Sequence, residues 1–307
     1  MNYKKAFVAA AAIFFLLSCT SGASVREGNS LLWKISGNGL SKPSYLFGTH
    51  HLVPISFLDS IPGVGEAFEE TEQTVGELDM GGDMPKMQML IMREAVMSQG
   101  MSYETLLSPD DRLLLDSMLR SVTGGVGLDQ LGQFKPAMLS NLISVALYRQ
   151  YYPSSASAAE QGLDLYFQEE ALKRSRPVIG LETAEEQISV LMNLQSPERQ
   201  AEMLMCMVKH PDLLRKEMDD LQTAYYAQDI RALRELYENG TPDDPCPATE
   251  EEKSAHNGDR NRMWLERLPV IMGERSSFIA VGCLHLTGTD GLIEGLRKQG
   301  YRVEEAR

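Results

Sequence analysis

The chain has 307 residues, 43% of them hydrophobic, which is enough apolar material for one large core or for two lobes. The formal net charge is −14 and no basic stripe interleaved with aromatic residues is present, so the composition argues against a nucleic acid as a partner. The negative charge favours solubility and repels the protein from anionic surfaces.

The first 18 residues are typical of a signal peptide. Lys4 and Lys5 precede an apolar run that ends at Leu17 and is too short to span a bilayer as a helix. The next residues, Leu16-Leu17-Ser18-Cys19, resemble the lipobox of bacterial lipoproteins, whose cysteine becomes lipid-modified and N-terminal. We therefore expect a lipoprotein signal peptide over residues 1–18 and a polar tether over residues 19–30.

An alternative is ordinary cleavage after Ser21-Gly22-Ala23, which would release a free secreted protein. The chain is exported in either case. Thr20 after Cys19 is similar to lipoproteins that are sent on to the outer membrane. We therefore expect a lipid-anchored protein of the bacterial cell envelope, attached to the outer membrane.

The remaining chain predicts strands near both ends and a mostly helical middle. Expected strands cover residues 31–36, 44–50, 74–79, 176–181, 277–281 and 301–304. Expected helices cover residues 57–71, much of 86–194, a stretch from 196 that continues past 211, and residues 250–273 and 292–299. These patterns predict an α/β fold, with a mixed β-sheet formed by N- and C-terminal strands, a large helical insertion and a single domain over residues 31–307.

Two apolar runs end in the same motif, a glycine followed three residues later by a histidine. The first is Gly48-Thr49-His50-His51 and the second is Gly282-Cys283-Leu284-His285. Ligands of open α/β sheets bind at strand ends, and imidazole is a common metal ligand and acid–base group. We expect His51 and His285 to converge if their strands are neighbours, whereas the alternative is a pair of hydrogen-bonded structural histidines.

Carboxylates follow two other expected strands. Glu77 and Asp79 share one face of a short strand, where a buried carboxylate needs a partner. Glu77 is a candidate metal ligand or general base, and a buried salt bridge to an arginine is the alternative. Glu182 lies at a strand end, although the dipole of the following helix would also explain it. The charged run that contains Arg260 and Asn261 is, by itself, typical of a solvated helix face.

Export changes the interpretation of the cysteines. Cys19 is the expected lipidation site, and Cys283 lies inside the second histidine motif. Cys206 and Cys246 are then a candidate disulfide, because an exported protein matures in an oxidising compartment. Two free buried thiols are the alternative.

Taken together, the motifs resemble the GumN/TraB-like family, which includes the Tiki metalloproteases. The resemblance covers nearly the whole chain after the signal peptide, through Leu32-Trp33-Lys34-Ile35, Tyr45-Leu46-Phe47-Gly48-Thr49-His50-His51, Glu77-Leu78-Asp79, Gly180-Leu181-Glu182-Thr183 with Gln187, Arg260-Asn261, Val281-Gly282-Cys283-Leu284-His285-Leu286 and Gly300-Tyr301. It implies a fold related to the erythromycin-esterase and ChaN-like group. It also implies metal-dependent peptide hydrolysis that uses both histidines and a glutamate.

The resulting hypothesis is a lipid-anchored, peptidase-like hydrolase. His51, His285 and Glu77 would hold a divalent metal (Mn, Co or Zn) whose bound water attacks a peptide or another small carbonyl substrate. Arg260 and Asn261, with Glu182, would orient groups or stabilise the oxyanion, and Asp79 would hold an imidazole in its required tautomer. Two alternatives remain open: a metal-free His51/Glu77 acid–base hydrolase, and a non-catalytic protein that binds a peptide or signal.

Overall fold

The computed structural model describes residues 29–82, 84–153, 162–241 and 244–306. The strands are β1 (Leu32–Ser36), β2 (Ser44–Thr49), β3 (Gln73–Gly76), β4 (Val178–Gly180), β5 (Ser277–Gly282) and β6 (Arg302–Glu305). The helices are α1 (Val64–Glu70), α2 (Met84–Glu94), α3 (Tyr103–Leu106), α4 (Pro109–Thr123), α5 (Leu128–Leu131), α6 (Pro136–Tyr151), α8 (Leu163–Lys173), α9 (Ala184–Asn193), α10 (Pro197–Lys209), α11 (Pro211–Tyr226), α12 (Ile230–Asn239), α13 (Glu250–Lys253), α14 (Asp259–Glu274) and α15 (Leu292–Lys298). Short 3₁₀ or π segments are η2 (Ile55–Ser60), η3 (Ser254–Gly258) and η4 (Cys283–His285). The expected signal peptide, Cys19 and most of the tether lie outside the described residues.

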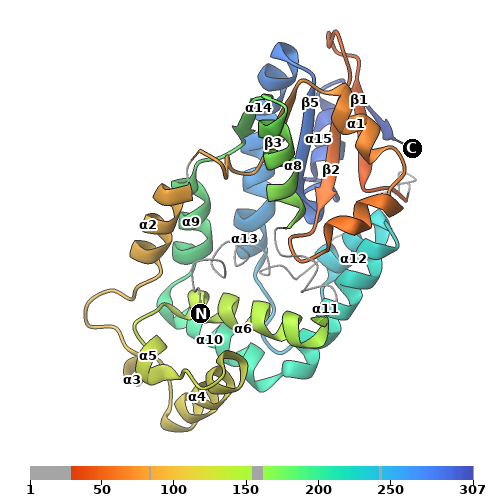
Figure 1. Cartoon of the computed structure of the whole chain (residues 1–307). Coiled ribbons are helices and arrows are strands. Elements are labelled where there is room, and N and C mark those ends of the chain that lie inside the picture. Colours follow the sequence, from red (N-terminus) through yellow and green to blue (C-terminus); the bar gives the residue numbers. More distant parts are fainter. Residues whose placement is uncertain (1–28, 83, 154–161, 242–243, 307) are drawn as a thin grey trace.

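The six strands form one mixed sheet in the order β4-β3-β5-β2-β1-β6. β2, β3, β4 and β5 are mutually parallel, whereas β1 is antiparallel to both β2 and β6. This confirms the predicted α/β class and the sheet built from strands near both ends of the chain. Strand β4 comes from within the helical middle, and Figure 1 shows the sheet at one end of the molecule with α3 to α6 and α10 at the other. The relation to the erythromycin-esterase and ChaN-like group stays a prediction.

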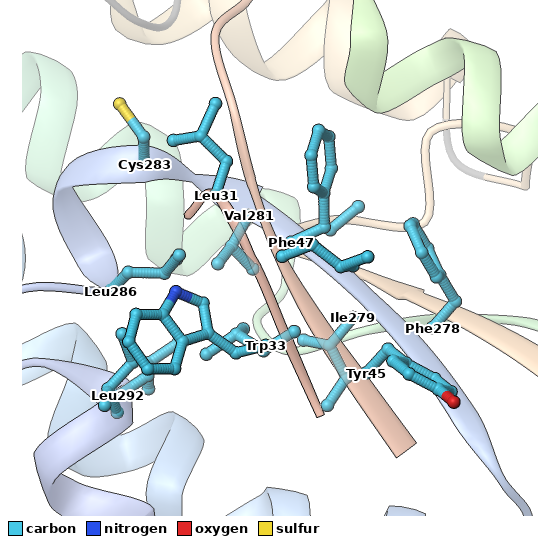
Figure 2. Packing of buried hydrophobic residues seen from close by; sticks show 14 of the residues in the cluster. Leu31, Trp33, Tyr45, Phe47, Phe278, Ile279, Val281, Cys283, Leu286 and Leu292 are labelled. Carbon is cyan, nitrogen blue, oxygen red and sulfur yellow. The ribbon is translucent and has the colours of Figure 1, made fainter. Parts of the chain in front are cut away.

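Central strands of a covered parallel sheet are apolar on both faces, which explains why β2 and β5 read as continuous hydrophobic runs. On one face Phe47 and Phe278 pack against Phe167 of α8. On the other face Trp33 lies under Arg297 of α15, and Figure 2 shows its indole beside Leu286 and Leu292. Helices therefore cover both faces, and the polar ends of the strands are left as the place for a ligand.

The helical middle has its own apolar clusters. One gathers buried side chains of α4, α6, α10 and α11 around Leu115, Leu139 and Leu204. Another joins α2, α6 and α9 and is rich in methionine. A disulfide joins Cys206 of α10 to Cys246, with 6.3 Å between their Cα atoms, and thereby ties the loop before α13 to this helical layer.

Some element boundaries differ from the expectation. The predicted helix over 57–71 is divided into η2 and α1, because Pro62 and Gly63 separate them and Gly63 has a φ of 78°. The helix expected to run past 211 breaks at His210, since the residue before a proline disfavours helical dihedrals. Strand β3 ends at Gly76, so Glu77 and Asp79 lie beyond the strand and not on one of its faces. None of the described helices is both long and apolar enough to cross a bilayer.

Candidate active site

The four parallel strands end at the same edge of the sheet, and each is followed by a predicted site residue. His51 follows β2, Glu77 follows β3, Glu182 follows β4 and His285 follows β5. In the register of the sheet, Thr49 pairs with Gly282 and Gly76 pairs with Gly180. Residues far apart in the sequence are therefore brought together because the carboxyl ends of parallel strands share one edge.

Glycine at these strand ends makes room for close packing. A Cβ on Gly48 would lie 3.1 Å from the Cα of Cys283, so the two histidine motifs touch through their backbones. A Cβ on Gly282 would lie 3.3 Å from Oε1 of Glu77, which instead accepts a hydrogen bond from the Gly282 amide at 2.9 Å. The motif glycines therefore allow β2, β5 and Glu77 to meet at one point.

Arg260 is the cation at the centre of the site. Its guanidinium donates to Oε2 of Glu77 at 2.7 Å and to both carboxylate oxygens of Glu182 at 2.5 and 3.0 Å. Gln187 of α9 completes the group by donating to Glu77 at 3.0 Å and to Glu182 at 2.9 Å. Arg260 and Asn261 are 5% and 0% exposed, so these two residues do not lie on a solvated helix face, whereas Arg262 of the same run is exposed.

These contacts set the charges of the two glutamates. Burial would raise the pKa of Glu77, but the charges of Arg260 and His51 and the hydrogen bond from the Gly282 amide outweigh burial and lower it to about 2. Burial raises the pKa of Glu182 in spite of its bonds to Arg260. Glu77 is therefore a carboxylate at neutral pH, and the buried arginine partner that the sequence offered as its alternative explanation is present as well.

His285 is fully enclosed and neutral. Asn261 donates through its amide nitrogen to the carbonyls of His285 and Asp290, so its oxygen faces Nδ1 of His285 at 2.7 Å and must accept from it. Nε2 is then the unprotonated nitrogen, and Nη1 of Arg260 lies 3.0 Å from it. Burial, reinforced by the charge of Arg260, lowers the pKa of His285 to about 3.

His51 has a different environment. Its Nδ1 lies 2.5 Å from Oδ2 of Asp164 in the first turn of α8, and Thr49 donates to the other oxygen of that carboxylate at 2.6 Å. Burial lowers the pKa of His51, but the carboxylates of Asp164 and Glu77 outweigh burial and raise it to about 9. The side chain of His51 is 29% exposed, whereas that of His285 is 3% exposed, so His51 is the imidazole that a solvent-borne substrate can reach.

The sequence assigned the orienting carboxylate incorrectly. Asp79 accepts hydrogen bonds from the amides of Gly81 and Gly82 in an exposed turn, because the chain has already left β3 at that point. The carboxylate that contacts an imidazole is Asp164 instead, at Nδ1 of His51. Its only signal in the sequence was an acid near the start of a helix, which is also typical of a simple dipole interaction.

Two other residues of the histidine motifs, His50 and Cys283, are hydrogen-bonded or buried and are not suited to catalysis. His50 accepts the amide hydrogen of Leu52 at Nδ1, and its ring centroid lies 6.1 Å from that of Tyr148 and 5.3 Å from that of Tyr225. Burial lowers its pKa to about 4, so it is neutral. Cys283 is a free, buried thiol whose pKa burial raises to about 12, which makes it unreactive.

Two hollows meet at this site. Both are lined by His51 and Glu77. The first continues over apolar side chains of α2, α6 and α9, including Met87, Met138 and Met192. The second continues past Arg260 and His285 toward α11 and α12. The two hollows share His51 and Glu77 and otherwise have different walls, so these two residues lie where the hollows meet.

The types of the candidate ligands suit a metal ion, but their positions do not. Two imidazoles and a carboxylate are suitable ligands for Mn, Co or Zn, and the tautomer of His285 directs an Nε2 lone pair toward the other donors. The guanidinium of Arg260, however, lies against both Nε2 of His285 and Oε2 of Glu77. Among the described residues, no three His, Cys, Asp or Glu side chains are grouped closely enough to hold an ion. This arrangement does not fit a bound metal.

The comparison with known proteins agrees with the motifs. The profile of the TraB/PrgY/gumN family matches residues 31–305. The chain belongs to the TraB/PrgY/gumN family. This match covers the whole sheet and every helix that supplies a residue to the site.

A curated relative aligns with most of the chain. The metalloprotease TIKI2 of Danio rerio is 23% identical over 326 aligned positions, which cover 93% of this chain and 62% of the relative. The chain thus spans about three fifths of the length of the relative. No solved structure matches the chain.

Proposed function

We propose that the protein is a hydrolase that cleaves a peptide, or a related carbonyl substrate, where the two hollows meet. The observation that supports this most directly is that a carboxylate, Glu77, and a cationic imidazole, His51, line the same cavity. Two titratable groups whose environments push their pKa values in opposite directions are the usual mark of an acid–base pair. The name of the relative supports the same class of reaction.

The charge states suggest how the roles divide. Glu77 is ionised at neutral pH and would accept a proton from the attacking water. His51 is protonated at neutral pH and would donate its proton to the leaving nitrogen or oxygen. Asp164 keeps the imidazole of His51 oriented and charged through the contact at Nδ1.

The remaining polar residues would serve the transition state. Arg260 is a buried, fixed cation beside Glu77, and in a site of low dielectric such a group stabilises a developing oxyanion well. Glu182 and Gln187 hold that guanidinium and Glu77 in place. Asn261 and His285 position the other side of Arg260.

The experiment is cleavage of a broad peptide library, read by mass spectrometry, with the mature protein and two variants. Glu77→Gln and His51→Gln are expected to lower kcat by about 10²- to 10⁴-fold, whereas His210→Gln is the matched control because His210 is exposed and lines neither hollow. Peptides that are bound tightly but never cut by the wild-type protein would favour the non-catalytic binding protein instead.

The relative's name, a metalloprotease, also supports a second candidate, a metal-dependent peptidase. Mn, Co or Zn would suit its imidazole and carboxylate ligands. His51, His285 and Glu77 are the residues that the family resemblance assigns to the ion, and they would gather around it only if Arg260 moved away from two of them. Elemental analysis of protein purified without chelators distinguishes the two candidates. About one equivalent of metal that is lost in His51→Ala and His285→Ala supports the metal-dependent candidate, and activity that survives exhaustive chelation supports the first.

We propose in addition that the protein is exported and anchored to the outer membrane through a lipid on Cys19. The lipobox-like Leu16-Leu17-Ser18-Cys19 supports this, and it lies outside the described residues. Cys19→Ser is expected to abolish incorporation of labelled fatty acid and to release the protein from the membrane fraction. Fractionation of cells that express either form is the measurement.

A further inference from the structure

Glu217 is a carboxylate in the second hollow that the acid–base scheme does not use. It lies on α11 and lines the same cavity as His51, Glu77 and His285. Its neighbours along that wall are apolar, namely Leu214, Met218, Leu221 and Leu236. A carboxylate in such company is costly unless a partner neutralises or hydrogen-bonds it.

Glu217 lacks a partner of opposite charge in the described part of the chain. Its one hydrogen bond there comes from the hydroxyl of Thr241 at 3.0 Å. The adjacent Lys216 is paired with Asp220 at 2.5 Å between nitrogen and oxygen. Burial raises the pKa of Glu217 to about 7, and the neighbouring charges of Asp244 and Asp220 add to the effect while Thr241 and Lys216 oppose it.

Each side chain of this cavity that could carry a positive charge is either paired with a carboxylate or neutral. Arg260 is bound to Glu77 and Glu182. His51 is paired with Asp164. Burial keeps His50 and His285 neutral, with pKa values lowered to about 4 and about 3. The described residues of the cavity therefore supply one acidic group, Glu217, without a matching positive charge.

We propose that Glu217 forms a subsite for a cationic group of the peptide substrate. The ammonium or guanidinium of a lysine or arginine side chain, or a free peptide amino terminus, would pair with the carboxylate, and the apolar wall would cover the aliphatic stem. This proposal rests on the proposed function, because it places the cationic residue within the cavity that holds His51 and Glu77.

The test is affinity selection of random peptides on immobilised mature protein, with the retained peptides identified by mass spectrometry. One library is N-acetylated and contains all residues, and a second has free amino termini but norleucine in place of lysine and citrulline in place of arginine. Glu217→Gln keeps the shape of the side chain and an oxygen for Thr241. Glu235→Gln removes an equal charge from an exposed position on the neighbouring α12 and is the matched control.

We expect wild type and Glu235→Gln to enrich cationic peptides about tenfold over neutral ones, a difference of about 1.4 kcal/mol, and Glu217→Gln to lose this preference. Enrichment in the acetylated library identifies a side chain as the cation, and enrichment in the second library identifies the amino terminus. Retention without a cationic preference, no retention in either library, or a preference that persists in Glu217→Gln would overturn the proposal.

Cleavage of the retained peptides separates this proposal from the proposed hydrolase. If the protein prefers cationic peptides through Glu217 but never cuts them, the subsite proposal is supported and the hydrolase proposal is wrong. If peptides are cut without any preference for a cation, the hydrolase proposal is supported and the subsite proposal is wrong. The two hypotheses can therefore fail independently.

Discussion

The imidazole of His51 and the carboxylate of Asp164 form a close pair, with 2.5 Å between Nδ1 and Oδ2. They come from different parts of the fold, since His51 follows β2 and Asp164 lies in the first turn of α8. The contact keeps a half-buried histidine charged at neutral pH and raises its pKa to about 9 against the opposing effect of burial. The behaviour of the protein at alkaline pH therefore depends on Asp164.

Replacing Asp164 by Asn should lower the pKa of His51, because burial then acts without the compensating charge. If His51 donates a proton, wild-type activity falls as the pH rises through about 9, and the variant loses activity at a lower pH. The pH profile of kcat and an NMR titration of the imidazole are the measurements. Thr49→Val is the control, since it removes the other partner of Asp164 and leaves the carboxylate. An unchanged alkaline limb in Asp164→Asn would show that another group controls it.

Removing the central cation should be far more costly for folding than removing a surface charge. Arg260→Met leaves Glu77 and Glu182 buried side by side, and breaking a buried pair in this way costs about 3–5 kcal/mol of unfolding free energy. Arg262→Met, on the same helix, breaks an exposed pair with Asp259 and should cost about 1 kcal/mol or less. Urea unfolding of both variants measures the difference. Similar values for the two would mean that the buried network contributes little to stability.

Acid should destabilise the protein below about pH 6.5. Burial of their imidazoles lowers the pKa values of His50, His256 and His285 to about 4, 4 and 3, so all three are neutral near pH 6.5. The unfolded chain therefore binds protons in this range that the folded chain does not, so the free energy of unfolding decreases as the pH falls from 6.5 to about 4. The raised pKa of His51 affects the free energy of unfolding in a different pH range. Its stabilising contribution is complete below pH 6.5 and is lost as the pH rises through about 9.

The variant that checks this is His50→Gln. It should reduce the slope of unfolding free energy against pH by about 1.4 kcal/mol per pH unit in the acid range, the equivalent of one proton. His210→Gln, at an exposed position, is expected to keep the wild-type slope. Urea unfolding at several pH values gives both slopes. Equal slopes in wild type and His50→Gln would show that His50 is not held neutral in the folded state.

The disulfide between Cys206 and Cys246 closes a loop with a sequence separation of 40. The Cys206→Ser/Cys246→Ser double variant should lose about 2–4 kcal/mol of unfolding free energy, since the unfolded chain gains freedom. Thermal melts with and without a reductant check this. The wild type should melt at a lower temperature in reductant, whereas the double variant should be insensitive to it. A melting temperature of the wild type that reductant does not change would contradict a stabilising bridge.

The sequence predicted the strands well where local chemistry was decisive. β2 and β5 are buried on both faces, so their apolar runs and terminal glycines could be recognised as strands without any tertiary information. The capping box at Thr183 and Glu186 was equally local and is present. The strand over 74–79 was predicted too long, because nothing in Glu77-Leu78-Asp79 shows that the chain turns after Gly76 to pass β4.

The side chains that end the buried strands can be identified from local sequence, because apolar runs and the glycines after them are properties of neighbouring residues. Which of those side chains meet depends on the packing of the whole fold. The tertiary structure placed Arg260 among three of them, assigned Asp164 and not Asp79 to an imidazole, and put Glu217 in the same cavity. Those contacts depend on how α8, α11 and α14 pack around the sheet, and packing of distant elements is set by the whole core and not by any local pattern.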